Sequence, residues 1–219
     1  MRTRMYVFLV MAVMATANVK AQNPYFPVKE GLVQIYAQKD AKGKVQSYSK
    51  QTIKDVEGTG NEMTVSYTTE VLDKKRKSTN PPVELSYQVQ IKDGVLRLDL
   101  KSMLGNIGQG GEAAGVAVEI PSDLKPGQKL KDSEVKMQIG FIKASAAMTE
   151  GECVAIEEIS VEAGTFACAK VSQMVNSSAM GIKTAGKQIT WYAPGVGAVR
   201  TETYNKDKLQ SVIELVEMN

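Results

Sequence analysis

Histidine is absent from this 219-residue chain, and the sequence holds only two cysteines and one tryptophan. Without an imidazole the chain cannot be a histidine-assisted serine or cysteine hydrolase, and it cannot build histidine-ligated metal sites. Carboxylate pairs and Ser–Lys pairs need no histidine, so the absence lowers the expectation of an enzyme without excluding every kind. We expect a protein that is not an enzyme and that carries no cofactor and no metal.

Long apolar runs are also missing, since a membrane-spanning helix needs about 20 residues. The one clear run, Met5–Ala17, follows Arg2 and Arg4 and precedes Val19-Lys20-Ala21. A positive start, a short apolar core and small residues before a cleavage point are typical of a secretory signal peptide.

The sequence therefore predicts a signal peptide over residues 1–21 and a single β-rich exported domain over residues 22–219, with no transmembrane span after signal removal. No cysteine lies in the leader or just after it, so we expect no N-terminal lipid. The periplasm is the favoured location, with outer-membrane association or release from the cell as alternatives.

The sequence has little net charge once the predicted signal peptide is removed. The chain has 27 basic and 24 acidic residues, and the leader holds three of the basic ones, Arg2, Arg4 and Lys20, and no acid. The remaining 24 basic residues equal the 24 acidic ones. We expect no nucleic-acid partner, because such binding depends on neutralising phosphates, and the net charge gives no better support to an anionic membrane surface.

What the chain does have is alternation of apolar and polar residues, the pattern of half-buried strands. It recurs over residues 63–71, 83–91, 96–100, 135–141, 189–191 and 209–215. Asp93-Gly94, between two such runs, is a strong hairpin signal. About ten to twelve strands at this spacing predict a mainly β fold, an antiparallel meander sheet that must curl to cover its apolar face.

Two stretches interrupt this rhythm. Residues 102–116 are rich in glycine, and we favour a loop there over a short helix at 109–114; the spacing matches no nucleotide-binding fingerprint. Residues 121–131 form a second connection.

Cys153 and Cys168 are an even pair in an exported chain, which suggests a disulfide. A tight turn at Ala163-Gly164, however, places Ile159 opposite Cys168 and Cys153 about 20 Å further along the strand, too far for a bond. A disulfide and two buried thiols both stay open.

Other chemistry-bearing residues have plain structural interpretations. Residues 74–77 are four cations that we expect at a solvated hairpin tip. Glu157 and Glu158 are adjacent, so they point to opposite faces of a strand and cannot act as a catalytic pair. Trp191 is either the floor of a ligand groove or, more commonly, a core anchor with its N–H bonded.

Several pieces resemble the TapB-like exported family of unknown function. They are Val161–Cys168, which holds Gly164 and Phe166; Thr190–Arg200, which holds Trp191, Pro194, Gly195 and Gly197; Ile120–Leu130; and Tyr25-Phe26-Pro27 with Glu30-Gly31. The resemblance implies a structural role for these motif residues, a Gram-negative envelope and a YmcC-like sheet bent into an open or half barrel. It supplies no catalytic residue. Members have proline where this chain has Glu162.

Two functions follow as hypotheses, and the sequence favours the first. The first is a non-catalytic binding or structural module whose partner is an envelope protein or a surface polymer. The second is a periplasmic carrier that binds a lipid or another hydrophobic ligand on the apolar face of the bent sheet.

Overall fold

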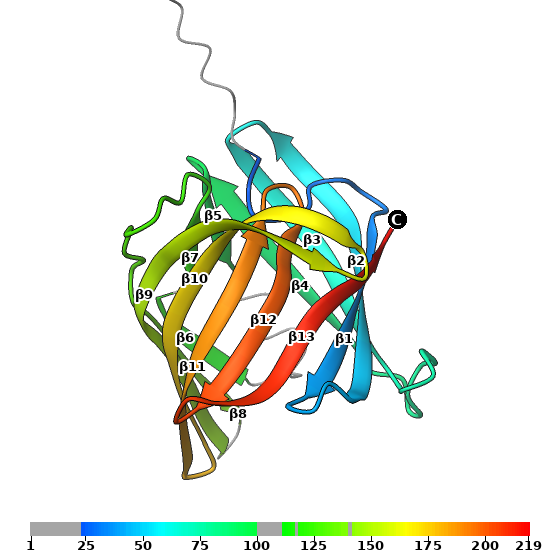
Figure 1. The fold of residues 1–219 in the computed structure, drawn as a ribbon, viewed down its shortest axis with the longest axis vertical. Coiled ribbons are helices and arrows are strands. Elements are labelled where there is room, and N and C mark those ends of the chain that lie inside the picture. The colour runs from blue at the N-terminus through cyan, green and yellow to red at the C-terminus, as the bar shows by residue number, and fades with distance from the viewer. Residues whose placement is uncertain (1–22, 100–110, 117, 140–141) are drawn as a thin grey trace, which may run out of the picture.

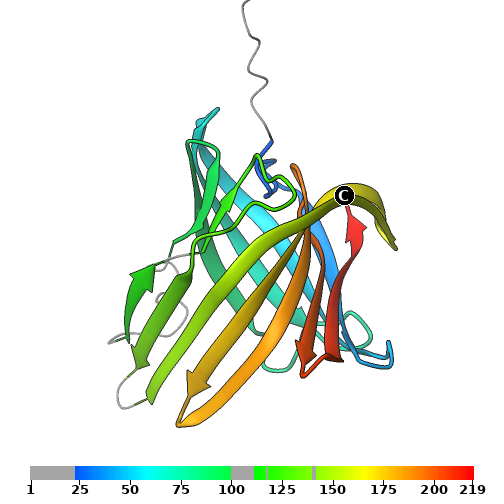
Figure 2. The ribbon, with the colours of Figure 1, turned by 60° about the vertical axis from the view of Figure 1, so that its left-hand side comes forward.

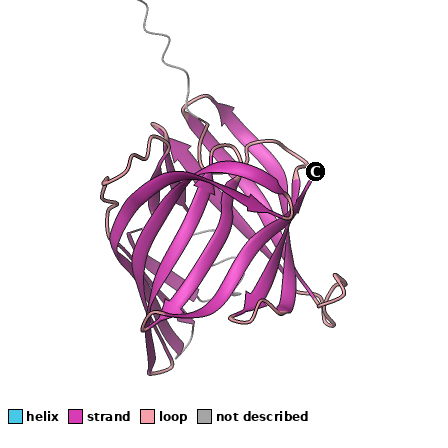
Figure 3. Cartoon of the chain, viewed as in Figure 1, coloured by secondary structure: helices cyan, strands magenta, loops and turns pink. Residues whose placement is uncertain are grey.

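In the computed structural model, every regular element among the described residues is a β-strand (Figure 3). The structure describes residues 23–99, 111–116, 118–139 and 142–219. In chain order the strands are β1 (Val33–Asp40), β2 (Val45–Thr59), β3 (Glu62–Leu72), β4 (Glu84–Lys92), β5 (Val95–Leu98), β6 (Gly111–Val116), β7 (Glu119–Pro121), β8 (Ser133–Ile139), β9 (Ile142–Val161), β10 (Gly164–Ala179), β11 (Ile182–Ala193), β12 (Gly197–Asn205) and β13 (Lys208–Met218). Within these ranges no helix could cross a bilayer.

The strands form one antiparallel sheet in the order β6-β8-β9-β10-β11-β12-β13-β1-β2-β3-β4-β5-β7. Most neighbours in the chain are neighbours in the sheet, and the pairing of β13 with β1 joins the two halves. The sheet curls strongly but does not close (Figures 1 and 2). The predicted antiparallel meander bent into an open half barrel is confirmed.

Local turn chemistry explains why the runs pair as hairpins. Asp93 and Gly94 join β4 to β5 with φ values of 52° and 72°. Positive φ at both central residues matches the right-handed twist of the flanking strands, and Asp-Gly tolerates it well.

The prediction of a loop over residues 102–116 is wrong for its last part. Residues 111–116 are edge strand β6, paired with β8, and residues 100–110 lie outside the described ranges. Pairing with β8 outweighs the low strand propensity of this glycine-rich stretch. Gly115 has φ 134°, and a Cβ there would collide with the backbone oxygen of Glu134, so glycine allows the close approach.

The main core lies on the concave face of the sheet. Cys153 and Val171, from one half of the sheet, pack in one cluster with Ile120, from the other edge. Only the inner face of a curled sheet brings such distant strands together. A neighbouring cluster holds Ile53 and Val65 from the centre of the second half.

Two segments outside the long strands cover this inner face at one end. The N-terminal segment (residues 23–32) precedes β1, and the strap (residues 122–132) runs from β7, at one edge of the sheet, to β8 near the other. The strap is tied to β9 by backbone hydrogen bonds between Gly127 N–H and Cys153 C=O (2.8 Å) and between Leu130 N–H and Gly151 C=O (2.8 Å). These bonds hold the strap against β9 at the upper end in Figure 1.

The outer face is covered in one place by the hairpin tip (residues 156–166) of β9 and β10. In Figures 1 and 2 this tip bends away from the sheet and passes across β11, β12 and β13. Ile159 and Phe166 of the tip pack against the cluster that contains Trp191 and Cys168. The molecule therefore has a packed cluster on its outer face as well as an inner core.

Candidate ligand cavity

A cavity of about 370 Å³ lies on the concave face, under the N-terminal segment. Strands from both halves of the sheet reach it: Tyr192 belongs to β11, whereas Leu96 belongs to β5. The other lining residues are Tyr25, Phe26, Pro27, Tyr36, Ser49, Gln51, Tyr67, Val89, Leu98, Val118, Ile120, Val196, Gly197, Ala198, Thr201 and Ile213. Its volume is in the range of small-molecule binding sites, which is about 300–1,000 Å³.

Aromatic rings line the cavity where the N-terminal segment covers it. The ring of Phe26 is 5.2 Å from that of Tyr67, tilted by 54°, and Tyr67 stacks on Tyr87 at 5.4 Å. On the other side Tyr25 lies 6.1 Å from Tyr192. These centroid distances are those of favourable aromatic contacts. The rings that line the cavity therefore also hold the N-terminal segment in place.

A buried glutamine organises the polar part of the wall. Gln34 is fully buried; its Nε2 donates to the Val196 carbonyl at 3.0 Å. Its Oε1 accepts from Gln51 Nε2 at 3.2 Å and from the Tyr36 hydroxyl at 3.3 Å. Because each polar atom has a partner, the network carries no large desolvation cost, and it fixes the directions of Tyr36 and Gln51.

The lining contains no ionisable carboxylate, lysine or arginine in the described part of the chain. Burial raises the pKa of Tyr36 and Tyr67 far above that of a free tyrosine and raises the pKa of Tyr192 as well. All three phenols therefore stay neutral hydrogen-bonding groups at physiological pH. Such a wall can bind an apolar body with an uncharged polar group.

The motif glycines of the β11–β12 turn contact the N-terminal segment. Pro194 and Gly195 form the turn between β11 and β12, with Gly195 at φ 73°, and Gly195 N–H donates to the Pro24 carbonyl at 2.7 Å. A Cβ on Gly197 would lie 3.6 Å from both Pro27 Cδ and the Tyr25 carbonyl oxygen. The turn is therefore the surface on which the N-terminal segment rests.

Trp191 is the core anchor of the outer face and does not line the cavity. Tyr192, its neighbour in the strand, faces inward, so Trp191 faces outward. Its Nε1 donates to Glu157 Oε1 at 2.7 Å, and Lys170 Nζ lies 5.0 Å from its ring centroid. The hydrogen bond from Trp191, with Lys170 nearby, holds the pKa of Glu157 below its usual range. Glu158 is exposed.

Both cysteines are free and buried. Of the two alternatives, a disulfide and two buried thiols, the structure has the thiols. Cys153 packs in an inner cluster with Tyr25, whereas Cys168 belongs to the Trp191 cluster. The residue opposite Cys168 is Glu157, not Ile159, because the turn is at Glu162-Ala163, one residue earlier than predicted. Burial raises the pKa of Cys168 to about 11, so its thiol is unreactive at neutral pH.

The remaining motif residues belong to the hairpin tip. Gly164 opens β10 with φ 140°, and a Cβ there would lie 3.7 Å from the ring of Phe166. Glu162, where the family resemblance leads to proline, lies 3.7 Å from Arg76 of the β3–β4 loop. Arg76 also contacts Glu217 at 3.1 Å and lies over Tyr48. The cation run 74–77 thus sits in a loop as predicted, but Arg76 has definite partners.

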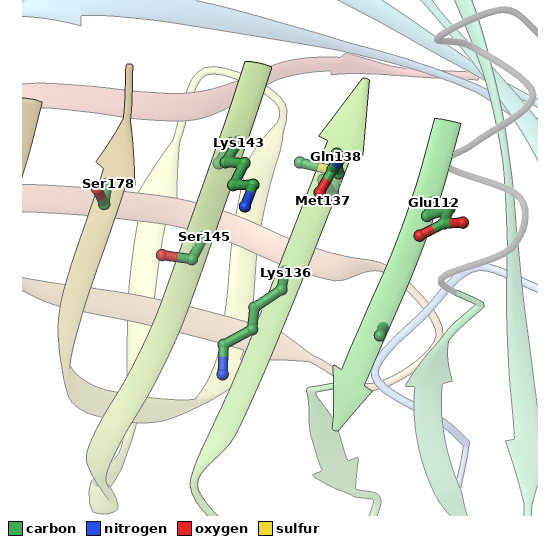
Figure 4. A pocket seen from close by; sticks show the side chains of 9 residues that line it. Glu112, Lys136, Met137, Gln138, Lys143, Ser145 and Ser178 are labelled. Carbon is green, nitrogen blue, oxygen red and sulfur yellow. The ribbon is translucent and has the colours of Figure 1, made fainter. Parts of the chain in front are cut away.

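A second hollow lies among β6, β8 and β9 (Figure 4), with a volume of about 410 Å³. Exposed charged and polar side chains dominate it: Glu112, Lys136, Gln138 and Lys143. Exposed, solvated side chains favour a surface groove over a built binding site. Among the described residues, no three histidine, cysteine, aspartate or glutamate side chains group as metal ligands would.

Sequence reasoning missed the cavity residues themselves. Tyr36, Gln51 and Tyr67 come from strands whose alternation was partly visible, but nothing in a single sequence shows which inward positions share one cavity. Gln34 gave a weak indication of a polar site, because it is a polar residue at an inward position of β1.

Comparisons with known proteins agree with this fold. A candidate exported protein with a YmcC-like fold from Bacteroides fragilis NCTC 9343 has a TM-score of 0.73 at 22% identity over 90% of this chain and 99% of its own. A candidate lipoprotein from Parabacteroides distasonis ATCC 8503 has a TM-score of 0.74 at 24% identity over the same shares.

Among curated proteins, none matches this sequence. The narrower TapB-like resemblance stays a prediction. The DUF3108-like family model, in contrast, matches residues 29–215, which include nearly all of the described strands. The chain belongs to the DUF3108-like family.

Proposed function

We propose that this protein is a non-catalytic binding protein of the Gram-negative envelope whose concave cavity holds a neutral hydrophobic ligand, such as the apolar chain of a lipid with an uncharged polar group. The leader-like residues 1–21 support export, and the periplasm is the favoured compartment. We thus favour the second hypothesis, a carrier of a hydrophobic ligand, over the module with a protein or polymer partner that the sequence alone favours.

One observation carries the proposal: an apolar cavity with satisfied, uncharged polar groups persists inside a sheet that has two covering segments. The cavity is partly open to solvent, so a ligand can enter it without unfolding the sheet. The Gln34 network and the neutral tyrosines give the wall orientation without charge. An anionic headgroup inside this cavity would find no cation to pair with, which favours a neutral ligand.

A pair of alanine-to-phenylalanine variants tests the cavity. Ala198→Phe adds a ring to the cavity wall, whereas Ala167→Phe adds the same ring at an exposed position of β10. With the neutral fluorescent probe N-phenyl-1-naphthylamine, we expect Ala198→Phe to weaken binding at least about tenfold because it occupies the ligand's space. Ala167→Phe should bind as the parent does. Thermal unfolding shows that both variants are folded.

Equal probe affinity in all three proteins, or no binding by the parent, contradicts the proposal. The charge preference is tested separately with 8-anilinonaphthalene-1-sulfonate, a similar aromatic body that carries a sulfonate. We expect it to bind at least about tenfold more weakly than the neutral probe, because the cavity holds no counter-charge. Native mass spectrometry of protein isolated from its own envelope then identifies a retained ligand.

A further inference from the structure

One end of the half barrel carries an unbalanced set of lysines. The β1–β2, β10–β11 and β12–β13 turns all lie at the lower end of the sheet in Figures 1 and 2, spread along its curve. We call this end the lysine rim; its cations are Lys42, Lys44, Lys143, Lys183, Lys206 and Lys208. All six are exposed, and none forms an ion pair within the described residues.

Only two acids lie in or beside the three turns, which hold five of the six lysines; the sixth, Lys143 of β9, lines the hollow of Figure 4 with Glu112. Asp40 is turned into its own hairpin, where its carboxylate accepts from the backbone N–H groups of Lys42 (2.9 Å) and Lys44 (3.0 Å) and from Gln46 Nε2 (2.8 Å). Asp207 lies in the β12–β13 turn. The rim is therefore strongly positive even though the chain without its leader is neutral overall.

Exposed apolar side chains lie within the same rim. Met180 and Ile182, on the two sides of the β10–β11 turn, are 75% and 71% exposed. Met180 is next to Lys143, because its N–H contacts the Lys143 carbonyl at 3.4 Å, and Lys183 follows Ile182. Large apolar groups at the extreme tip of a hairpin, flanked by lysines, have no packing role inside this chain.

We propose that the lysine rim docks on an anionic lipid surface, with Met180 and Ile182 entering the headgroup layer. Lysines on flexible stems let their apolar stems lie among the lipids while the ammonium groups stay at the phosphates. The composition argues against a protein partner, because protein interfaces are enriched in arginine and aromatic residues and depleted in lysine, whereas the six cations of the rim are all lysines. This inference does not depend on what the cavity binds.

Matched charge variants test the docking. The rim variant replaces Lys143, Lys183, Lys206 and Lys208 by glutamine, and the control replaces Lys29, Lys54, Lys92 and Lys125, four exposed lysines away from the rim. Both lose four positive charges, so net charge alone cannot separate them. Binding is measured by co-sedimentation with vesicles of 70% phosphatidylcholine and 30% phosphatidylglycerol, and with pure phosphatidylcholine vesicles.

The parent should bind the anionic vesicles and lose binding as salt is raised, because surface charges are screened. Each lysine near an anionic surface contributes about fivefold in affinity, so the rim variant should bind at least about 100-fold more weakly. The control should stay within about fivefold of the parent. Met180→Asn with Ile182→Thr should weaken binding about tenfold with the charges intact.

Equal loss in the rim variant and the control overturns the proposal, because binding would then follow net charge. Absence of parent binding to the anionic vesicles overturns it too and leaves an acidic protein surface as the partner to test. Circular dichroism confirms that the variants keep the sheet. Probe binding in the cavity should be unchanged in the rim variant, so failure here is distinguishable from failure of the proposed ligand site.

Discussion

Trp191 and Tyr192 are adjacent in β11 yet belong to opposite kinds of environment. Trp191 is in a packed outer cluster, with its ring N–H on Glu157 and the hairpin tip around it. Tyr192 faces a cavity on the inner face. A stable β-protein usually places its best packing inside. Here the concave face carries both the main core and a cavity, and the packed cluster around Trp191 on the outer face adds a second site of close packing.

The strongest test of this contrast is the removal of the outer anchor. Trp191→Ala should lower the free energy of unfolding by about 3–5 kcal/mol, because a large buried side chain is lost and a cavity remains. Trp191→Phe should lose less, since most of the packing survives. Urea unfolding is followed by circular dichroism, because Trp191 is the only tryptophan. A loss below about 1 kcal/mol for the alanine variant would show that the outer cluster does not carry the stability.

The next largest effect concerns the cover of the cavity. Gly197 has φ 97° and contacts the N-terminal segment, whereas Gly43 has φ 78° in an open turn with no atom within 4 Å of a built Cβ. Alanine at either position should lower the free energy of unfolding by about 1–3 kcal/mol through backbone strain.

Only Gly197→Ala should also loosen the N-terminal segment. Limited trypsin digestion, with cleavage after the exposed Lys29 followed by mass spectrometry, should be faster in this variant and unchanged in Gly43→Ala. Equal cleavage rates in the two variants would mean that the turn does not hold the cover.

A moderate effect is expected from alkaline pH at Cys168. Burial raises its pKa from 9.0 to about 11, so the folded protein binds the thiol proton more tightly than the unfolded chain does. The resulting stability is fully present below about pH 9 and is lost as pH rises from about 9 to about 11.

The measurement compares the urea midpoints of the parent and Cys168→Ala from pH 8 to pH 11. The tyrosines titrate in both proteins, so the difference between the two curves isolates Cys168, and it should narrow as pH rises. Iodoacetamide at pH 8 should modify neither cysteine in the folded protein and both in urea. Rapid modification of Cys168 under native conditions would show that the Trp191 cluster does not bury this thiol.

The smallest effect belongs to the contact that ties the hairpin tip to the β3–β4 loop. Arg76→Ala removes the pairs with Glu162 and Glu217, but these side chains are 37%, 63% and 45% exposed. Exposed ion pairs contribute little, so the free energy of unfolding should fall by about 0.2–1 kcal/mol. Lys74→Ala, in the same loop, serves as the control. A loss above about 2 kcal/mol would mean that the tip depends on this loop.

The strands and turns were predictable because their signals are local. The alternation over residues 63–71 and 83–91 and the Asp93-Gly94 turn each depend on neighbouring residues alone, and all three appear as expected. The bonded indole of Trp191 was also foreseeable, since a buried N–H needs a partner. Its partner, Glu157, is 34 positions away and could not be named.

Features that depend on curvature could not be predicted. Strand β6 exists because β8 supplies hydrogen bonds to a glycine-rich stretch, and the cavity exists because curvature brings Tyr192 and Leu96, from distant strands, to one hollow. The lysine rim could not be predicted either, because the net charge of the chain is near zero. Lys42 and Lys206 are far apart in the sequence and lie at the same end of the sheet only in the folded protein.

The contact between Pro24 and Gly195 has a consequence for the order in which the protein folds. Synthesis and secretion deliver the chain from its beginning, so Tyr25 and Phe26 emerge early, whereas the turn on which they rest is among the last parts to arrive. Contacts this distant in sequence form late, because closing a long loop costs entropy before it returns any energy. Until then two aromatic side chains stay without their final neighbours, so the first residues of the domain are among the last to reach their native position.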